Sequence, residues 1–410
     1  MKRAPVRAIP LVRRALRSYV RRVIPARYVN LDAARAKFGD RVDRLAPFLL
    51  RGDPLADDLV EAMESMPRGR GWALFNQELA RPGSCKGEMP EAMRAFFAHV
   101  DRVPLWVDWT AIERGGELLM RSGAIGGIVL GAASLVMGYS SPGGNKPLVF
   151  SGRLINRAIR RLNETARFVQ ATGRPGGLRR NADGFAITVK VRLMHAKVRR
   201  ILRRTEDFRQ DLWGDPINQH DMAATTLLFS LIFLEGLRSF GLEMTRDESE
   251  SFMHLWRYSG YLSGVDEEIL PGSEFDGWSL GHLIKATQAP PDEDSRTLVN
   301  ALFDSTVREA KTPEERRMGE VRRRMGWGFC RGLLGDEMAD SLGVPRTPFV
   351  VGFHALRAVA TVAEQARARS SEAHRVAVAT GTRYWDKVVE VGLAGVPAEF
   401  SPPERLVSAA

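Results

Sequence analysis

The sequence predicts an all-α protein with a single large helical domain. Apolar residues recur at helical spacing through most of the chain, and no segment shows sustained alternation of apolar and polar residues. Breaks rich in Gly and Pro separate these runs, but no long low-complexity linker divides the chain. The composition, 44% hydrophobic and 27% charged over 410 residues, provides enough apolar surface for a core and excludes wholesale disorder.

Residues 1–30 are expected to form a basic arm. Ile9, Val12, Leu16 and Val23 recur at helical spacing, and arginines occupy the remaining faces. No uninterrupted apolar core follows the basic start, so we expect no secretory signal and a cytoplasmic, non-secreted protein. A basic amphipathic helix can lie on an anionic membrane, which predicts peripheral contact with the inner membrane surface through residues 1–27. The alternative is a solvated arm that packs one face on its own domain.

Beyond the arm, the periodic runs predict the order of the helices. Asp215 before Pro216 is typical of a helix start, as are the acidic residues from Asp292 to Asp294. Helices are expected at about 56–66, 109–135, 147–171, 184–205, 216–240, 246–263, 295–309, 314–330, 349–369 and 371–388.

The run from Ala124 to Tyr139 is uncharged but short. Its 16 residues fall below the roughly 20 needed to cross a bilayer, so a buried core helix is the favoured interpretation. Gly123, Gly127 and Gly131 lie four residues apart and leave one helix face almost bare. Such a face admits the backbone of another helix, which we favour, or a flat cofactor.

Most standard catalytic motifs are absent from the sequence. It contains no GxxxxGK[ST] loop and no GxSxG elbow, and its two cysteines, Cys85 and Cys330, form no CxxC pair. The seven histidines are scattered, and none pairs with another at metal-ligand spacing. The net charge of +11 favours an anionic partner, but no recognisable nucleic-acid-binding module accompanies it, so we expect no nucleic acid. A helical chain of this kind leaves a haem protein among the few enzyme classes still open.

The helix expected over 186–205 places His195 at the centre of an apolar stripe. Arg192 and Arg199 flank it at minus three and plus four. A haem ligand needs an imidazole on an apolar wall, with cations nearby for the propionates. The alternative is a core histidine bonded within the protein, beside arginines that only solvate the helix.

The helix expected over 148–171 carries polar residues on a core-facing line. Arg161 and Thr165, one turn apart, interrupt that line. An unpaired buried guanidinium is costly, so Arg161 should face an anion, a carboxylate or a wet cavity. Glu164, three residues from Arg161, offers a local helix salt bridge as the exposed alternative.

These two helices and their neighbours resemble the rubber oxygenase (latex-clearing protein) family, which includes the MpaB-type oxygenases. The resemblance covers about 113–265 of a domain expected over 50–395, followed by a disordered tail at 396–410. It rests on the order and spacing of SGRLINRAIRRLNETARFV at 151–169, VRLMHAKVRRI at 191–201, WGDPINQHDMAATTLLFS at 213–230 and HLWRYSGYLSGV at 254–265.

The resemblance implies a b-type haem in a globin-like helical core. His195 matches the histidine that ligates the iron, with Arg192 and Arg199 as flanking cofactor-binding residues. Arg161 and Thr165 match two residues of a distal Arg-x-x-Lys-Thr segment, in which Glu164 replaces the lysine of the rubber-cleaving members. Arg161, Glu164 and Thr165 are therefore the candidate catalytic residues. The implied reaction is cleavage by O2 of a carbon–carbon double bond in a hydrophobic small molecule or polyisoprenoid.

The replacement by Glu164 keeps a second hypothesis open. The chain would then be a non-catalytic haem carrier or sensor, or a helical interaction protein at a membrane surface. His220 and His254 stay outside the predicted ligand set, because such histidines are commonly structural.

Overall fold

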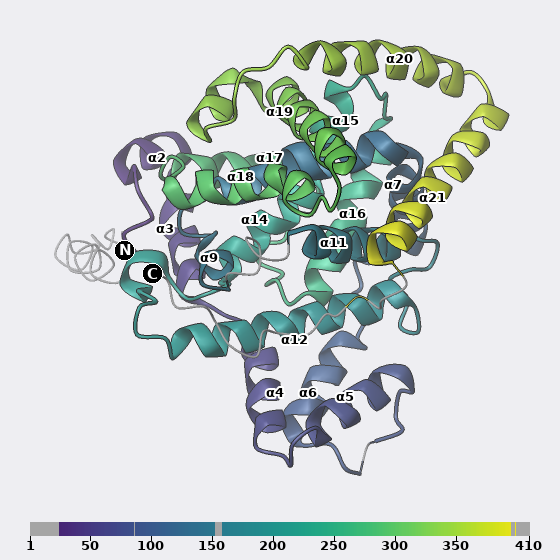
Figure 1. Ribbon diagram of the computed structural model, residues 1–410. Coiled ribbons are helices and arrows are strands. Elements are labelled where there is room, and N and C mark those ends of the chain that lie inside the picture. Colours follow the sequence, from purple (N-terminus) through teal and green to yellow (C-terminus); the bar gives the residue numbers. More distant parts are fainter. Residues whose placement is uncertain (1–23, 86, 152–157, 395–397, 399–410) are drawn as a thin grey trace, which may run out of the picture.

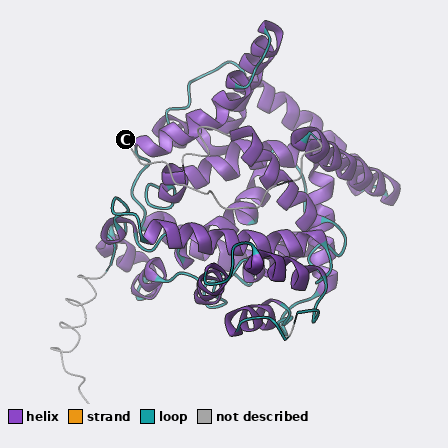
Figure 2. Cartoon of the chain, turned by 60° about the horizontal axis from the view of Figure 1, so that its bottom comes forward, coloured by secondary structure: helices purple, strands orange, loops and turns teal. Residues whose placement is uncertain are grey.

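The computed structural model describes residues 24–394 and 398, apart from residue 86 and residues 152–157. Within them the regular structure is helical, with one isolated antiparallel bridge between Tyr28 and Gln288 (Figure 2). The predicted all-α, single-domain fold is therefore confirmed. The arm up to residue 23 and the tail 396–410, apart from residue 398, lie outside the described residues.

The first helix in the described part of the chain begins at Leu31, upstream of the expected domain boundary at 50. The N-terminal half contains α2 (Leu31–Phe38), α3 (Arg41–Leu45), η1 (Ala46–Leu50), α4 (Pro54–Glu64), α5 (Arg70–Ala80), α6 (Glu91–Val100), α7 (Trp109–Val129), η2 (Leu130–Ser134), α8 (Leu135–Tyr139), α9 (Lys146–Ser151), α11 (Ala158–Gly173) and α12 (Asp183–Arg203). The C-terminal half contains α13 (Gln210–Trp213), α14 (Gln219–Phe229), α15 (Leu231–Ser239), α16 (Arg246–Leu262), α17 (Glu274–Ala286), α18 (Glu293–Arg308), α19 (Pro313–Ser341), α20 (Val350–Ala368) and α21 (Ser371–Leu393).

The helices surround a central group made of α7, α11, α14 and α16 (Figure 1). The long helix α12 runs beneath this group, and α4, α5 and α6 form a lower lobe against it. On the opposite side, α19, α20 and α21 wrap around the top and one flank. The helix α11 packs against α7, α12, α18 and α21, so it occupies the interior of the arrangement.

The ten predicted runs coincide with helices wherever they are described, but three details differ. The helix expected over 216–240 is broken at Ser230 into α14 and α15. Its cap is Asn218, whose side chain accepts from the backbone N–H of Asp221, so the predicted start at Asp215 is wrong. Asp215 instead forms an ion pair with Arg203. The run over 314–330 extends as α19 to Ser341, with a kink at a left-handed glycine.

Several short helices were not predicted from the periodicity, notably α2, α5, α6 and α17. Each has 13 residues or fewer. Isolated helices of this length are marginal in water, so tertiary packing rather than local pattern stabilises them. The start of α18 was predicted correctly, because Asp292 forms a capping box with Ser295.

The bare glycine face of α7 packs against α21. Gly123 adopts a left-handed conformation, with φ of 47°, and faces the backbone of Gly381. A Cβ on Gly381 would lie 1.9 Å from the carbonyl oxygen of Met120. A Cβ on Gly127 would meet the Tyr384 hydroxyl at 2.5 Å, whereas one on Gly131 would meet nothing within 4 Å. Close helix packing, the favoured interpretation, is confirmed at the first two glycines.

Two helical stretches are long and apolar enough to cross a membrane by length and composition alone. They are Trp109–Tyr139 and Gln219–Ser239, and their most apolar windows are 67% and 56% buried within the protein. This burial favours the interpretation of the first stretch as a core helix.

Candidate functional site

The imidazole of His195 is part-buried, and one of its two ring nitrogens has no polar partner among the described residues. Its ring nitrogen Nδ1 is buried without a hydrogen bond to any described residue. The pKa of His195 is lowered to about 4, chiefly by burial and then by the charges of Arg199 and Arg161, while Asp53 opposes the shift. The ring is therefore neutral at physiological pH, which is the state that metal ligation requires.

The positive charge of Arg161 affects the side chains of two other helices. The positive charge of Arg161 acts on His195 from α11, and it also acts on Tyr139 at the end of α8. Burial raises the pKa of Tyr139 to about 12, and Arg161 partly opposes that shift. Among the described residues Arg161 has no carboxylate within ion-pair distance. An interior cation without such a partner leaves room for an anionic or polar ligand beside His195.

Tyr139 is a site residue that the sequence did not reveal. It closes the apolar run that begins at Ala124, and the fold brings it within range of the charge of Arg161. Its position at the end of an uncharged helix, next to a Gly/Pro-rich turn, was the available signal. Because the tyrosine is protonated at neutral pH, it can donate a hydrogen bond.

The interior helix α11 is only half-buried, although it packs against four other helices. Residues 159–168 all retain partial exposure. Phe168, on the same line as Arg161 and Thr165, contacts an aromatic pair in which Phe229 stacks on Trp256 at 5.1 Å between ring centroids. An aromatic wall thus continues the line of polar residues along α11.

Glu164 pairs with Arg160 and not with Arg161. The Arg160 Nε donates to Glu164 Oε1 at 3.1 Å, one helical turn away, and both side chains are part-buried. The expected local salt bridge therefore exists with a different arginine. Thr165 follows on the same helix and is half-buried.

Arg192 and Arg199, the two arginines that flank His195, are bound to carboxylates at the lower lobe. Arg192 donates Nε and Nη2 to the two oxygens of Asp53, at 2.7 and 2.9 Å. Arg199 donates to Asp57 at 2.6 Å and to the carbonyl of Ile217 at 3.1 Å. These buried ion pairs hold α12 on α4, and they argue against a role for either arginine at haem propionates. That role stays an untested prediction.

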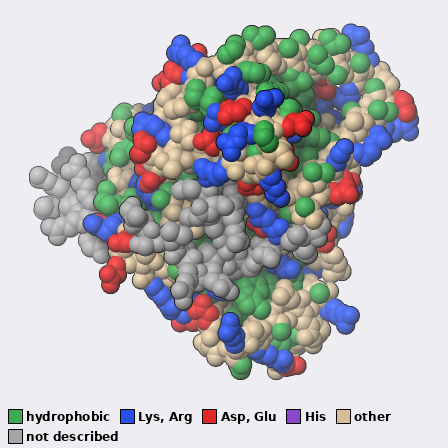
Figure 3. Space-filling model, viewed as in Figure 1, with side chains coloured by type: hydrophobic (Ala, Val, Ile, Leu, Met, Phe, Trp, Pro, Cys, Tyr) green, Lys and Arg blue, Asp and Glu red, His purple; other side chains and the backbone are tan. Residues whose placement is uncertain are grey.

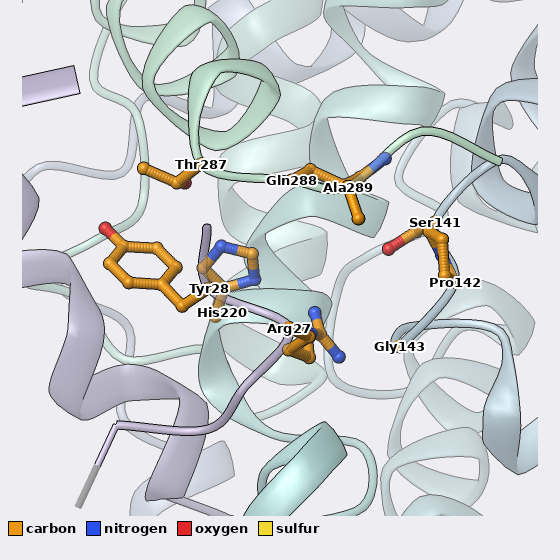
Figure 4. Close-up of a pocket in the computed structure, with 9 residues that line it drawn as sticks. All are labelled: Arg27, Tyr28, Ser141, Pro142, Gly143, His220, Thr287, Gln288 and Ala289. Atoms are coloured by element: carbon orange, nitrogen blue, oxygen red, sulfur yellow. The ribbon is translucent and has the colours of Figure 1, made fainter. Parts of the chain in front are cut away.

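His220 and His254 make contacts that differ from those of His195. His254 accepts a hydrogen bond from the backbone N–H of Asp108, and burial lowers its pKa. His220 lines a small cavity with Arg27 and Tyr28, shown in Figure 4. The cavity volume of about 10 Å³ is close to that of one water molecule. Neither geometry indicates a haem ligand.

The described residues would suit a haem held by His195 better than a bare metal ion. No group of three or more His, Cys, Asp or Glu side chains in the described part of the chain is placed to hold a metal. A single neutral imidazole suffices as the protein ligand of a haem iron. His195 would hold the iron, and Arg199 and Arg161 are the cations whose charges act most strongly on its ring.

Comparisons with known proteins place the chain in a family. Residues 119–365, more than half of the chain, match the family of the ER-bound oxygenase mpaB/B'/rubber oxygenase catalytic domain. A rubber oxygenase from Streptomyces sp. (strain K30) is 24% identical over 290 residues. These residues span 67% of this chain and 66% of that relative's length.

A solved structure supports the same placement at the level of the fold. The latex clearing protein in its closed state matches with a TM-score of 0.65 and 21% identity. The match covers 83% of this chain and 91% of that structure. The chain therefore belongs to the mpaB/B'/rubber oxygenase catalytic-domain family.

Proposed function

We propose that this protein is a haem b-dependent oxygenase that cleaves a carbon–carbon double bond in an apolar, isoprenoid-like substrate. The observation that carries the proposal is the Nδ1 atom of His195, which is buried without a hydrogen-bond partner on a ring that the charge of Arg161 also affects. Membership of the oxygenase family and the relative named rubber oxygenase support the class of reaction. We further propose a cytoplasmic location, with peripheral membrane contact through residues 1–27.

The proposed reaction balances without an external reductant. O2 supplies one oxygen atom to each carbon of the double bond, and two carbonyl products result. Bound haem would supply the chemistry that activates O2. The substrate carries no charge, so the protein's polar groups are free to act on the oxygen atoms as negative charge develops.

Each polar residue near His195 has a distinct proposed role. Arg161 donates hydrogen bonds to developing negative charge, because it is a cation without a described carboxylate partner. Tyr139 is a second, neutral donor. Glu164 is held as a carboxylate by Arg160 and can accept a proton, while Thr165 offers a hydroxyl on the same turn. Phe168, Phe229 and Trp256 provide an apolar wall for the substrate chain.

The ion pair between Arg160 and Glu164 favours a second candidate function. Glu164 replaces the lysine of the rubber-cleaving members, and its carboxylate is already engaged. A non-catalytic haem carrier or sensor needs no proton acceptor at this position. Oxygen-dependent formation of carbonyl products from a prenyl substrate separates the enzyme from the carrier.

The absorption spectrum of the purified protein tests the haem assignment. We expect a Soret band in the wild type and loss of haem in His195→Ala with the helical fold retained. His282→Ala is the matched control, because His282 is exposed and stacks on Trp278. A His195→Ala variant with full haem content would remove His195 from the site. A wild-type protein that cannot be loaded with haem would overturn both haem functions.

A further inference from the structure

A surface cleft lies between the N-terminal helices and α17. Its volume is about 310 Å³, which falls within the range of small-molecule pockets, roughly 300–1,000 Å³. One side is formed by α3 and η1, and the other by residues 268–272 and α17. The candidate functional site lies on α8, α11 and α12, and none of its residues lines this cleft.

The floor of the cleft is apolar and consists of core residues. Leu45 and Phe48 line it from the N-terminal side, and Leu280 and Leu283 line it from α17. All four side chains are buried, so packing with the rest of the protein fixes their positions. A ligand with an apolar group would gain free energy by covering the part of this floor that faces the cleft.

Two arginines of α3 stand at the edge of this floor. Arg41 Nη1 donates to Ser279 Oγ at 2.5 Å, and this contact connects α3 with α17. Arg44 lies three residues further along α3 and lines the same cleft. It is exposed, and its side chain has no hydrogen bond or ion pair with the described residues. The cleft is therefore preorganised and presents arginine donors that are free to bind a ligand.

The two acidic residues that line the cleft have cations of their own. Glu268 lies 3.9 Å from Arg51, and the charge of Asp276 acts on Arg257. Neither of these two arginines lines the cleft. Within the described residues, no carboxylate of the cleft lies within ion-pair distance of Arg41 or Arg44. The uncompensated charge of the cleft is therefore positive and lies on α3.

The described surface elsewhere mixes charges of both signs. Figure 3 shows Lys and Arg side chains interspersed with Asp and Glu side chains over the visible face. Such a mixed surface does not attract anions in general, so an anion needs a local site where cations lack acidic partners. The cleft combines such a site with an apolar floor.

We propose that this cleft binds an amphipathic carboxylate. Arg44 and Arg41 bind the carboxylate group, and the apolar body of the ligand covers Phe48 and Leu280. Arginine suits this ligand because its planar fork forms charge-assisted, bidentate hydrogen bonds with a carboxylate. The site does not depend on the proposed oxygenase activity, because it shares no residue with the candidate functional site.

Isothermal titration calorimetry of the full chain with octanoate tests this site. We expect saturable binding of one octanoate per chain. Arg44→Gln should weaken it by about tenfold or more, because it removes charge-assisted hydrogen bonds. The matched control is Arg68→Gln, at an exposed arginine between α4 and α5, which should bind octanoate as the wild type does. A wild-type protein that shows no saturable binding, or equal affinities of the wild type and Arg44→Gln, would overturn the proposal.

Two probes of the same chain length test the chemistry of the ligand. 1-Octanol lacks the charge of octanoate, and octylamine reverses it. Both should bind at least about tenfold more weakly than octanoate. Octylamine that binds as tightly as octanoate would mean that Glu268 and Asp276 make this a cation site. Octanol that binds as tightly would mean that only the apolar floor acts, and either result would overturn the proposal.

The variant Arg161→Ala tests where octanoate binds. Its side chain belongs to the candidate functional site and does not line the cleft, so the variant should bind octanoate as the wild type does. Loss of binding in Arg161→Ala with retention in Arg44→Gln would place the carboxylate beside His195 and overturn the proposal.

Discussion

Burial determines the chemical state of the most important side chain, His195. A histidine on an exposed helix would titrate near pH 6.5, whereas enclosure between α11 and α12 lowers the pKa of His195 to about 4. The neutral ring retains a nitrogen lone pair for a ligand throughout the physiological range. Its neighbours Arg192 and Arg199 are buried too, and their guanidinium groups form ion pairs with Asp53 and Asp57.

The pair between Arg192 and Asp53 provides a test at this scale. Asp53→Asn removes the carboxylate and leaves Arg192 unpaired in the interior, where both side chains are almost fully buried. We expect a loss of about 3–5 kcal/mol in the free energy of unfolding, measured by urea denaturation. Asp43→Asn, which breaks an exposed pair with Arg35, should cost less than about 1 kcal/mol. If Asp53→Asn instead released haem without changing stability, Arg192 would belong to the cofactor site.

A second test at the residue scale concerns His99 and acid stability. The pKa of His99 is lowered to about 4, chiefly by burial and then by the charge of Arg192. Below pH 6.5 the unfolded chain takes up a proton that the folded chain binds only near pH 4. The stabilising effect of the neutral ring is therefore complete above about pH 6.5 and is lost as the pH falls towards 4.

The shift corresponds to at most about 3 kcal/mol of stability. The difference in unfolding free energy between the wild type and His99→Gln should accordingly change in this pH window and level off outside it. A difference that stays constant from pH 7 to pH 4 would show that His99 titrates normally.

At the scale of elements, the packing of α7 on α21 depends on small residues. Gly381 has no room for a side chain, because a Cβ there would lie 1.9 Å from the Met120 carbonyl oxygen, and Gly123 has a positive φ of 47° that disfavours other residues. Since α21 also packs against α11, this crossing fixes the helix that carries Arg161 and Glu164. The hydrogen bond from Asn163 Nδ2 to the Gly392 carbonyl, at 2.6 Å, links α11 to α21.

Two alanine substitutions separate close packing from helix propensity. Gly381→Ala places a methyl group against the Met120 carbonyl and should destabilise the fold by about 1–3 kcal/mol, because the helices must move apart. Gly131→Ala has open space around the new methyl group and should be neutral or stabilising by up to about 1 kcal/mol. Thermal unfolding of the two variants checks both expectations. Equal effects of the two substitutions would mean that α21 does not hold its position on α7.

At the scale of the whole molecule, a short segment after the arm attaches the N-terminal region to the core. The backbone N–H groups of Ala26 and Arg27 donate to the carbonyls of Asp211 and Leu212. The Arg27 guanidinium binds Asp221, a buried carboxylate at the start of α14. The arm therefore leaves the protein from a fixed point.

Two truncations test this attachment. Removal of residues 1–23 keeps the hydrogen bonds of Ala26 and Arg27 to the core, so we expect a smaller change in melting temperature than for a truncation that deletes Arg27. Removal of residues 1–27 also deletes Arg27, leaves Asp221 without its guanidinium partner, and should lower the melting temperature by several degrees. Equal melting temperatures of the two truncated proteins would show that the Arg27 contacts contribute little to the fold.

The sequence by itself determined the helical class, the long helices and the position of His195 on an apolar stripe. These features depend on the spacing of residues three and four apart, which is visible in any window of the chain. The family segments around 151–169 and 191–201 also lie in the sequence, and they led to the candidate residues Arg161, Glu164 and Thr165.

The tertiary structure alone decided which partners these residues have. Asp53 lies 139 residues before Arg192, so no local pattern could predict their ion pair. The sequence also could not show whether Arg192 is buried or lies on a solvated surface. Only the fold brings Tyr139 within range of the charge of Arg161. The periodicity of 349–369 likewise predicted a helix, but a stripe of valines does not reveal whether it faces the core or the surrounding medium. That choice depends on the helices that α20 contacts, and they leave its apolar face exposed.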